Sequence, residues 1–397
     1  MKKITLLTAA LLVVCGGFIQ ATGNLTLTKL WNKADYVWNK TNGSRDMDYY
    51  NGKLYVIDKT SKNIHVIDAN DGSELPGEAI AHADINGYSV AADDAGNLFA
   101  TNGGYGMTHC IKGGKIVSGV YTTLGNTTIP GSPGRFDFVE LYGNIEGDNG
   151  GYMIASTVNT ADNVAVWPMK NGAIVNAATP FMFNNLRGAF KTGADAAAVD
   201  ANSFWLSGQS LKPLLITMST DKTTTSKQEL AISAIPNCGG IASFTLKGIT
   251  YVVVPGSSLN GAVNIFDATN MAHPVLKETT EDIASVANGA IHVGIEATVK
   301  NDIAYIYVWS PNNGAAAYKF EDSTPTNISA ETAEAPARVF ANAEGIQAEF
   351  EGEANIELFS ISGAMIDKAT ATGYYKANVD KGIYLVKING VTYKVVK

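Results

Sequence analysis

Residues 52–72 read GKLYVIDKTSKNIHVIDANDG. The two runs at 53–58 and 64–68 are rich in Val, Ile and Tyr, which favour β-strands. A polar segment, 59–63, separates them, and the stretch ends in Asn-Asp-Gly, a turn-forming sequence. The stretch therefore predicts an antiparallel hairpin followed by a polar turn.

This pattern occurs six times along the chain. Its anchor residues lie 44, 53, 53, 47 and 53 positions apart, at Tyr55, Phe99, Tyr152, Trp205, Val252 and Tyr305. A candidate inner strand precedes each copy, at residues 45–49, 87–92, 136–141, 194–199, 240–244 and 290–297. A period of roughly 40–50 residues with four short strands per repeat is typical of β-propellers.

The segment from Leu25 to Leu30 precedes the first repeat and alternates at the period of a strand. We expect it to supply the outer strand of the last repeat and so close the ring. The predicted fold of residues 24–322 is therefore an all-β, six-bladed β-propeller, with seven blades as the next choice. A β-sandwich is the other architecture that this pattern allows.

The composition changes after the last repeat. Residues 323–337 are polar and contain Pro325 and Pro336, which is typical of a linker. Residues 338–397 are again rich in strand-forming runs, with Asn389-Gly390 between two of them. Asn-Gly in that position is a strong hairpin signal, so we expect a small C-terminal β-sandwich.

The N-terminus has the layout of a secretory signal peptide. Lys2 and Lys3 precede an apolar run, residues 4–14, and small residues follow at 21–23. The run is too short to span a bilayer, and no later segment is long and apolar enough. We expect residues 1–23 to be removed, which leaves 27 basic against 37 acidic residues and a net charge of −10. That balance argues against nucleic acid as a partner.

The C-terminal residues resemble a known class of domain. KGIYLVKI at 381–388, LFSISGAMI at 358–366 and the final YKVVK resemble the C-terminal sorting domains of type IX secretion in Bacteroidetes. The resemblance implies the secretion machinery as a partner and an address at the cell surface or outside the cell. The periplasm and a plain immunoglobulin-like accessory domain are the alternatives. The repeated part resembles secreted, propeller-like Bacteroidetes proteins of unknown function, and carries over no catalytic residues.

No motif for a cofactor or a metal is present. The five histidines form no i, i+4 pair, and there is no nucleophile elbow, P-loop or dinucleotide fingerprint. We therefore expect no cofactor and no metal. After signal removal two cysteines remain, Cys110 and Cys238, which the repeat places in well-separated blades. We expect two buried thiols rather than a disulfide.

Propellers usually bind ligands where their inner strands begin. Those positions supply the ligand-binding candidates Arg45, Asp46, Tyr88, Arg135, Asp137, His292 and Glu296, with Asp195 nearby. The alternative is that they form ion pairs in turns. The leading hypothesis is an exported, non-catalytic binding platform for a glycan or a protein. The other hypotheses are a glycosidase or lyase using Asp46, Asp137 or Glu296, and a structural surface protein.

Overall fold

The computed structural model is all-β, apart from one turn of 3₁₀ helix, η1 (Pro76–Glu78). It describes residues 25–40, 43–81, 87–101, 106–112, 115–123, 136–157, 164–175, 181–183, 194–209, 211–220, 225–233, 239–290, 292–322, 337–342, 344–361 and 363–397. The expected signal peptide (1–23), Arg135, Cys238 and all but the last residue of the expected linker (323–337) lie outside these ranges. Within them, no helix is long and apolar enough to cross a membrane.

The chain forms two compact units, residues 1–324 and residues 325–397. The first contains six antiparallel sheets, each with four strands in simple order; the third has one further strand. Sheet 1 comprises β2 (Ser44–Tyr50), β3 (Lys53–Asp58), β4 (Asn63–Asp68) and β5 (Ile80–Ala81). Sheet 2 comprises β6 (Val90–Ala92), β7 (Leu98–Thr101), β8 (Gly106–Lys112) and β9 (Lys115–Thr123).

The remaining sheets repeat this plan. Sheet 3 comprises β10 (Phe136–Gly143), β11 (Gly151–Thr157), β12 (Val164–Lys170), β13 (Ala173–Ile174) and β14 (Phe181–Phe183). Sheet 4 comprises β15 (Asp195–Asp200), β16 (Ser203–Ser207), β17 (Leu214–Met218) and β18 (Thr225–Glu229), and sheet 5 comprises β19 (Ala242–Leu246), β20 (Ile249–Pro255), β21 (Val263–Asp267) and β22 (Val275–Thr279). Sheet 6 comprises β23 (Gly294–Lys300), β24 (Ile303–Ser310), β25 (Gly314–Asp322) and β1 (Leu25–Lys33).

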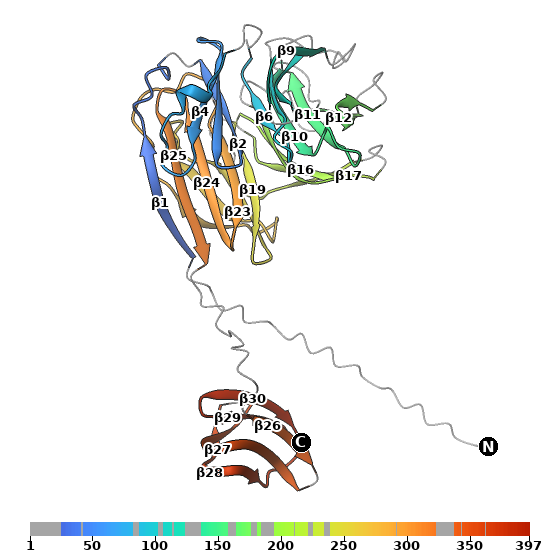
Figure 1. Cartoon of the computed structure of the whole chain (residues 1–397), viewed down its shortest axis with the longest axis vertical. Coiled ribbons are helices and arrows are strands. Elements are labelled where there is room, and N and C mark those ends of the chain that lie inside the picture. The colour runs from blue at the N-terminus through green and yellow to red at the C-terminus, as the bar shows by residue number, and fades with distance from the viewer. Residues whose placement is uncertain are drawn as a thin grey trace, which may run out of the picture. The chain divides into compact units, whose positions relative to one another are not determined.

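The first strands of the six sheets contact one another in cyclic order. β2 contacts β6, β6 contacts β10, and the series continues through β15, β19 and β23 back to β2. The N-terminal strand joins the last sheet, where β1 runs antiparallel to β25 from Leu25↔Asp322 to Lys33↔Ala315 (Figure 1). This confirms the predicted pairing of the N-terminal segment with the last repeat.

The hydrophobic core lies between the sheets. In β3, Leu54 and Val56 pack toward sheet 6, whereas Tyr55 and Ile57 pack toward sheet 2. Successive side chains of a strand point to opposite faces, so an uninterrupted apolar run buries both faces of its sheet. One such apolar cluster fills each of the six boundaries between neighbouring sheets, including the one between sheets 6 and 1.

The second unit is a single antiparallel sheet with its own apolar core. Its strands are β26 (Ala337–Asn342), β27 (Gly345–Ser360), β28 (Met365–Ala377), β29 (Ile383–Ile388) and β30 (Val391–Val396). β26 and β30 lie at opposite ends of the strand order and still contact each other, so the sheet curls around its core. The two layers of a sandwich stay a prediction.

Candidate functional site

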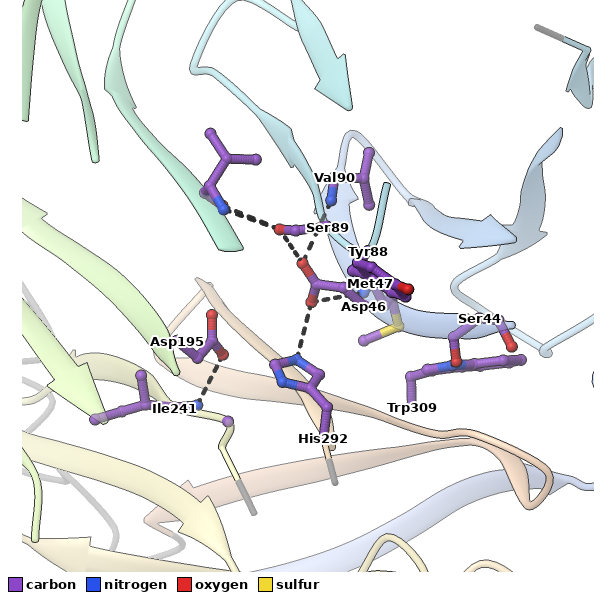
Figure 2. Close-up of polar contacts among 12 residues, drawn as sticks. Ser44, Asp46, Met47, Tyr88, Ser89, Val90, Asp195, Ile241, His292 and Trp309 are labelled. Atoms are coloured by element: carbon purple, nitrogen blue, oxygen red, sulfur yellow. Dashed lines mark hydrogen bonds and ion pairs between the residues drawn. The ribbon is translucent and has the colours of Figure 1, made fainter. Parts of the chain in front are cut away.

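The predicted candidates Asp46 and His292 meet in a buried polar network. Asp46 lies on β2, and His292 stands two residues before β23. The Nε2 atom of His292 lies 3.4 Å from Oδ1 of Asp46, and the two residues are 3% and 6% exposed (Figure 2). Sheets 6 and 1 are therefore joined by a buried contact between two ionisable side chains.

Asp46 has three further partners. Its Oδ1 accepts a hydrogen bond from the backbone N–H of Met47 at 2.9 Å. Its Oδ2 accepts from the hydroxyl of Ser89 and, at 3.3 Å, from the backbone N–H of Val90. The carboxylate thus satisfies donors from sheets 1, 2 and 6, and all four contacts appear in Figure 2.

Similar side-chain acceptors link the other sheets. Backbone N–H groups of one first strand donate to a side chain of the preceding sheet: Ala92 to Asp48, Val139 to Ser89 (3.0 Å), Ala198 to Glu140 (3.0 Å) and Ile241 to Asp195 (3.2 Å). Between sheets 5 and 6 the link is backbone to backbone, from Val293 N–H to Gly239 C=O at 3.0 Å. Every pair of neighbouring sheets in the cycle is therefore bridged near its first strands.

The strand arrangement explains why acidic residues occupy these positions. Each first strand pairs with the second strand of its own sheet along one edge only. N–H groups on the other edge need acceptors because an unpaired buried N–H is costly. Asp46 and Asp48 stand two positions apart on β2 and so share one face, which lets both reach sheet 2.

The carboxyl groups of the network influence one another across the ring. Burial raises the pKa of Glu296 well above its ordinary value, and the neighbouring carboxylates Asp48, Glu140 and Asp195 raise it further. These three neighbours belong to sheets 1, 3 and 4, whereas Glu296 belongs to sheet 6. The side chains therefore converge from different sheets on one region.

Burial also raises the pKa of the other carboxyl groups in this region. The pKa values of Asp48 and Asp195 rise to about 7, and that of Glu140 rises well above its ordinary value. Burial acts in this direction because it disfavours the charged form of an acid. The region thus retains protons at a pH where ordinary carboxyl groups have lost them.

The pKa of His292 is set by two opposing effects, burial and the charges of its neighbours. Burial by itself lowers its pKa, but the hydrogen bond and charge of Asp46 and the charge of Asp195 raise it more. The guanidinium of Arg45 opposes them weakly, and the pKa of His292 ends above its ordinary value of 6.5. The imidazolium form is therefore favoured between the two carboxylates.

A cationic and aromatic group lies beside the network. The guanidinium of Arg45 stands 4.1 Å from the ring centre of Tyr88, and the ammonium of Lys59 stands 4.2 Å from it. Lys59 also donates a hydrogen bond to the Tyr88 hydroxyl at 2.8 Å. All three side chains are partly exposed, and Arg45 and Tyr88 directly precede Asp46 and Ser89 in the chain. We call Arg45, Lys59 and Tyr88 the cationic triad.

The structure thus brings five of the predicted candidates into one region. Asp46 contacts His292, Arg45 contacts Tyr88, and Glu296 is electrostatically coupled to the network. The backbone of Asp137 lies in β10, at the register shift between Phe136 and Phe138, and its side chain is not described. Arg135 lies outside the described residues.

Sequence analysis missed Asp48 and Glu140. The alternation of Asp46 and Asp48 on one strand was the signal for Asp48, because both side chains take the same face. Glu140 lies farther along β10 than the strand-start positions at which the candidates were predicted. Among the described residues, no three His, Cys, Asp or Glu side chains are arranged to hold a metal ion.

Ser89 offers a direct test of the bridging role. Replacing it by alanine leaves the N–H of Val139 without its acceptor and removes one of the two donors to Oδ2 of Asp46 in a fully buried place. We expect Ser89→Ala to lower the free energy of unfolding by about 1–3 kcal/mol, measured by denaturant unfolding. Ser226→Ala, at an exposed position of β18, is the control, and an equal loss in both variants would argue against a special role for Ser89.

Comparison with known proteins gives a fold relationship and no family. No protein-family model matches this sequence, and no curated protein matches it. Among solved structures, a DUF4623 family protein from Bacteroides eggerthii is similar, with a TM-score of 0.53 and 11% sequence identity. The similarity covers 75% of this chain and 74% of that one. At this identity the comparison shows a shared fold with a Bacteroides protein and transfers no function.

Proposed function

We propose that this chain is an exported, non-catalytic binding protein whose first unit is a six-bladed β-propeller that presents a polar ligand site beside its centre. The observation that carries the proposal is the use of Asp46, whose two oxygens serve four partners from three sheets. A carboxylate held in this way is poorly placed to exchange protons with a substrate. The cyclic contacts of the six first strands support the propeller assignment.

The address of the protein is part of this proposal. The basic and apolar N-terminal segment supports export, and the C-terminal strands support recognition by a secretion machinery with delivery to the cell surface or the medium. The second unit has its own apolar core, built around Ile346, Ile356 and Val386, so it can serve as a separate sorting or accessory module with the proposed sandwich form.

The ligand site that we favour is the cationic triad. Guanidinium and ammonium groups bind carboxylates and sulfates, and an aromatic ring stacks against the apolar face of a sugar. Arg45 and Lys59 are cations in a chain with a formal net charge of −8, so they make this place electrostatically distinct. An acidic glycan or an acidic segment of a protein combines the features that the triad would recognise.

Binding assays on glycan and protein arrays, followed by calorimetry, test the proposal. We expect Arg45→Ala and Tyr88→Ala each to weaken binding of the selected ligand at least tenfold, because each removes a contact worth about 1.4 kcal/mol or more. A matched control exists at Lys300, whose ammonium lies 5.4 Å from the ring centre of Tyr49 and donates to its hydroxyl at 2.6 Å. Equal loss of binding in Lys300→Ala would contradict the assignment of the site.

The alternative function, a glycosidase or lyase, now rests on Glu296. Its pKa is raised, as a general acid requires, and no hydrogen bond or ion pair engages its carboxyl group among the described residues. Asp48 and Glu140 are its acidic neighbours. Turnover on a polysaccharide panel that Glu296→Gln abolishes, in a protein that still folds, would replace the non-catalytic proposal by this one.

A further inference from the structure

We propose that the contact between His292 and Asp46 is a proton-operated latch, which closes the ring between sheet 6 and sheet 1 and loosens as the pH rises. The inference does not depend on any ligand. It concerns the one boundary where sheets from opposite ends of the repeat series meet, with β23 beside β2. Cyclic closure depends on this boundary, because opening it would expose the apolar faces of sheets 6 and 1 that pack against each other.

The geometry places a titratable group at this boundary. The buried contact of His292 with Asp46 joins sheet 6 to sheet 1 through charge. Further polar links between these sheets include the Trp309 indole N–H, which donates to the Ser44 carbonyl at 3.2 Å and does not titrate, and the exposed Lys300 ammonium, which donates to the Tyr49 hydroxyl at 2.6 Å. At the boundaries from sheet 2 round to sheet 6, backbone N–H groups bridge the first strands, and these donors stay protonated throughout.

The charged groups around His292 determine the direction of the response. Asp46 and Arg45 act on it from β2, and Asp195 acts on it from β15 (Figure 2 shows Asp46 and Asp195 near the imidazole). Asp46 and Asp195 in turn raise the pKa values of Glu140 on β10 and Glu296 on β23, and Asp46 also raises that of Asp48 on β2. When His292 loses its proton, the imidazolium charge that favours its contact with Asp46 disappears.

For His292, Asp48 and Asp195 the linkage of protons to folding has the same sign: the stability of the folded state falls as the pH rises. A histidine with a raised pKa contributes stability that is complete below pH 6.5 and is lost as the pH rises through the folded-state pKa. Asp48 and Asp195 bind protons in the folded state up to about pH 7, whereas the unfolded chain releases them near pH 3.8. Their ionisation therefore also lowers the stability of the folded state as the pH rises. At high pH the carboxylates then lie close together without the positive charge of His292.

Nuclear magnetic resonance of the whole secreted chain, labelled in its histidine rings, tests the latch without altering it. We expect the His292 resonance, assigned by its absence in His292→Gln, to titrate above pH 6.5. Asp195→Asn removes one anion and keeps the contact with Asp46, so it should lower this pKa by about half a unit or more. Titration of His292 at or below 6.5 would overturn the proposal.

Hydrogen exchange measures whether the boundary loosens. After correction for intrinsic rates, we expect peptides covering β2 and β23 to exchange at least fivefold faster at pH 8.5 than at pH 5.5. His65→Gln is a matched control, because His65 is also buried and contacts a carboxylate, Glu74 at 3.1 Å, but both belong to sheet 1 and its loop. This variant should keep the pH response, and His292→Gln should exchange fast at both pH values. A pH-independent boundary in the unaltered protein would refute the latch.

Discussion

Replacing Asp46 by alanine is expected to lower the free energy of unfolding of the first unit by about 3–5 kcal/mol, the usual cost of removing one partner from a buried ion pair. Asp46 is 6% exposed and its partner His292 is 3% exposed, so water cannot replace the missing carboxylate easily. The variant also leaves the Ser89 hydroxyl and the Val90 N–H without their acceptor.

Thermal unfolding provides the measurement. A loss of this size should lower the midpoint by roughly 6 °C or more in a unit of this length. Asp46→Asn separates charge from shape, because an amide oxygen can still accept one of the hydrogen bonds. We expect it to lie between the unaltered protein and Asp46→Ala, and its deficit to be largest at acidic pH, where His292 is charged.

An exposed ion pair supplies the control for this experiment. Lys29 and Glu281 form a contact at 2.9 Å, and the Glu281 side chain is 84% exposed. Exposed pairs contribute little, so Glu281→Ala should leave the midpoint within about 1 °C of the unaltered value. If Asp46→Ala behaved like Glu281→Ala, the network would not hold the sheets together.

The strands of the first unit could be predicted because each central strand buries both faces. A run such as Leu54–Ile57 has no polar interruption, and the repeat of such runs indicates the number of sheets. The pairing of the N-terminal segment could be predicted because the last repeat lacked one strand and because apolar and polar residues alternate at 25–30. The local sequence pattern and the repeat length were therefore enough to predict this part of the fold.

The second unit was harder to predict from sequence. Residues 345–360 form one long strand, β27, whose register with β28 shifts between Glu349 and Glu353. Polar residues at the shift have the composition of a turn, although the pairing with β28 resumes beyond them. The start of β26 is weakly marked in the sequence, because Ala337–Asn342 adjoins a polar segment and has Val339 as its one β-branched residue.

The candidate site was only partly predictable for a related reason. Sequence shows which residues begin a strand, and this identified Asp46 and His292. It does not show which N–H groups of a neighbouring sheet remain unpaired, and these decide where an acceptor is needed. Glu140 meets the N–H of Ala198, a residue 58 positions away, so neither strand alone indicates the contact.

Removal of β1 is expected to abolish cooperative folding of the first unit. A chain that begins at Ala34 lacks the strand whose residues pair with β25 from Ala315 to Asp322. It also lacks Trp31, whose indole N–H donates to the Ala69 carbonyl at 3.0 Å, and Leu27, which packs against the core between sheets 5 and 6. The combined loss is comparable with the whole stability of a domain, about 5–15 kcal/mol.

The exposed edge of β25 adds a second consequence. An unpaired strand edge can recruit another chain, so we expect the shortened chain to elute as aggregates in size-exclusion chromatography. A chain that begins at Leu25 keeps β1 and should remain monodisperse, with a sharp thermal transition. This control separates the role of the strand from that of the segment before it.

Adding the missing strand back distinguishes ring closure from a general folding defect. A synthetic peptide of residues 25–33 carries the complete β1 sequence LTLTKLWNK, and binding it in place of the natural strand should restore part of the thermal transition. The same peptide with Trp31 and Leu27 replaced by alanine should restore much less, because it keeps the backbone pairing but not the packing. If the chain beginning at Ala34 unfolded with the midpoint of the chain beginning at Leu25, the first and last repeats would hold together without β1, through the packing of sheet 6 against sheet 1.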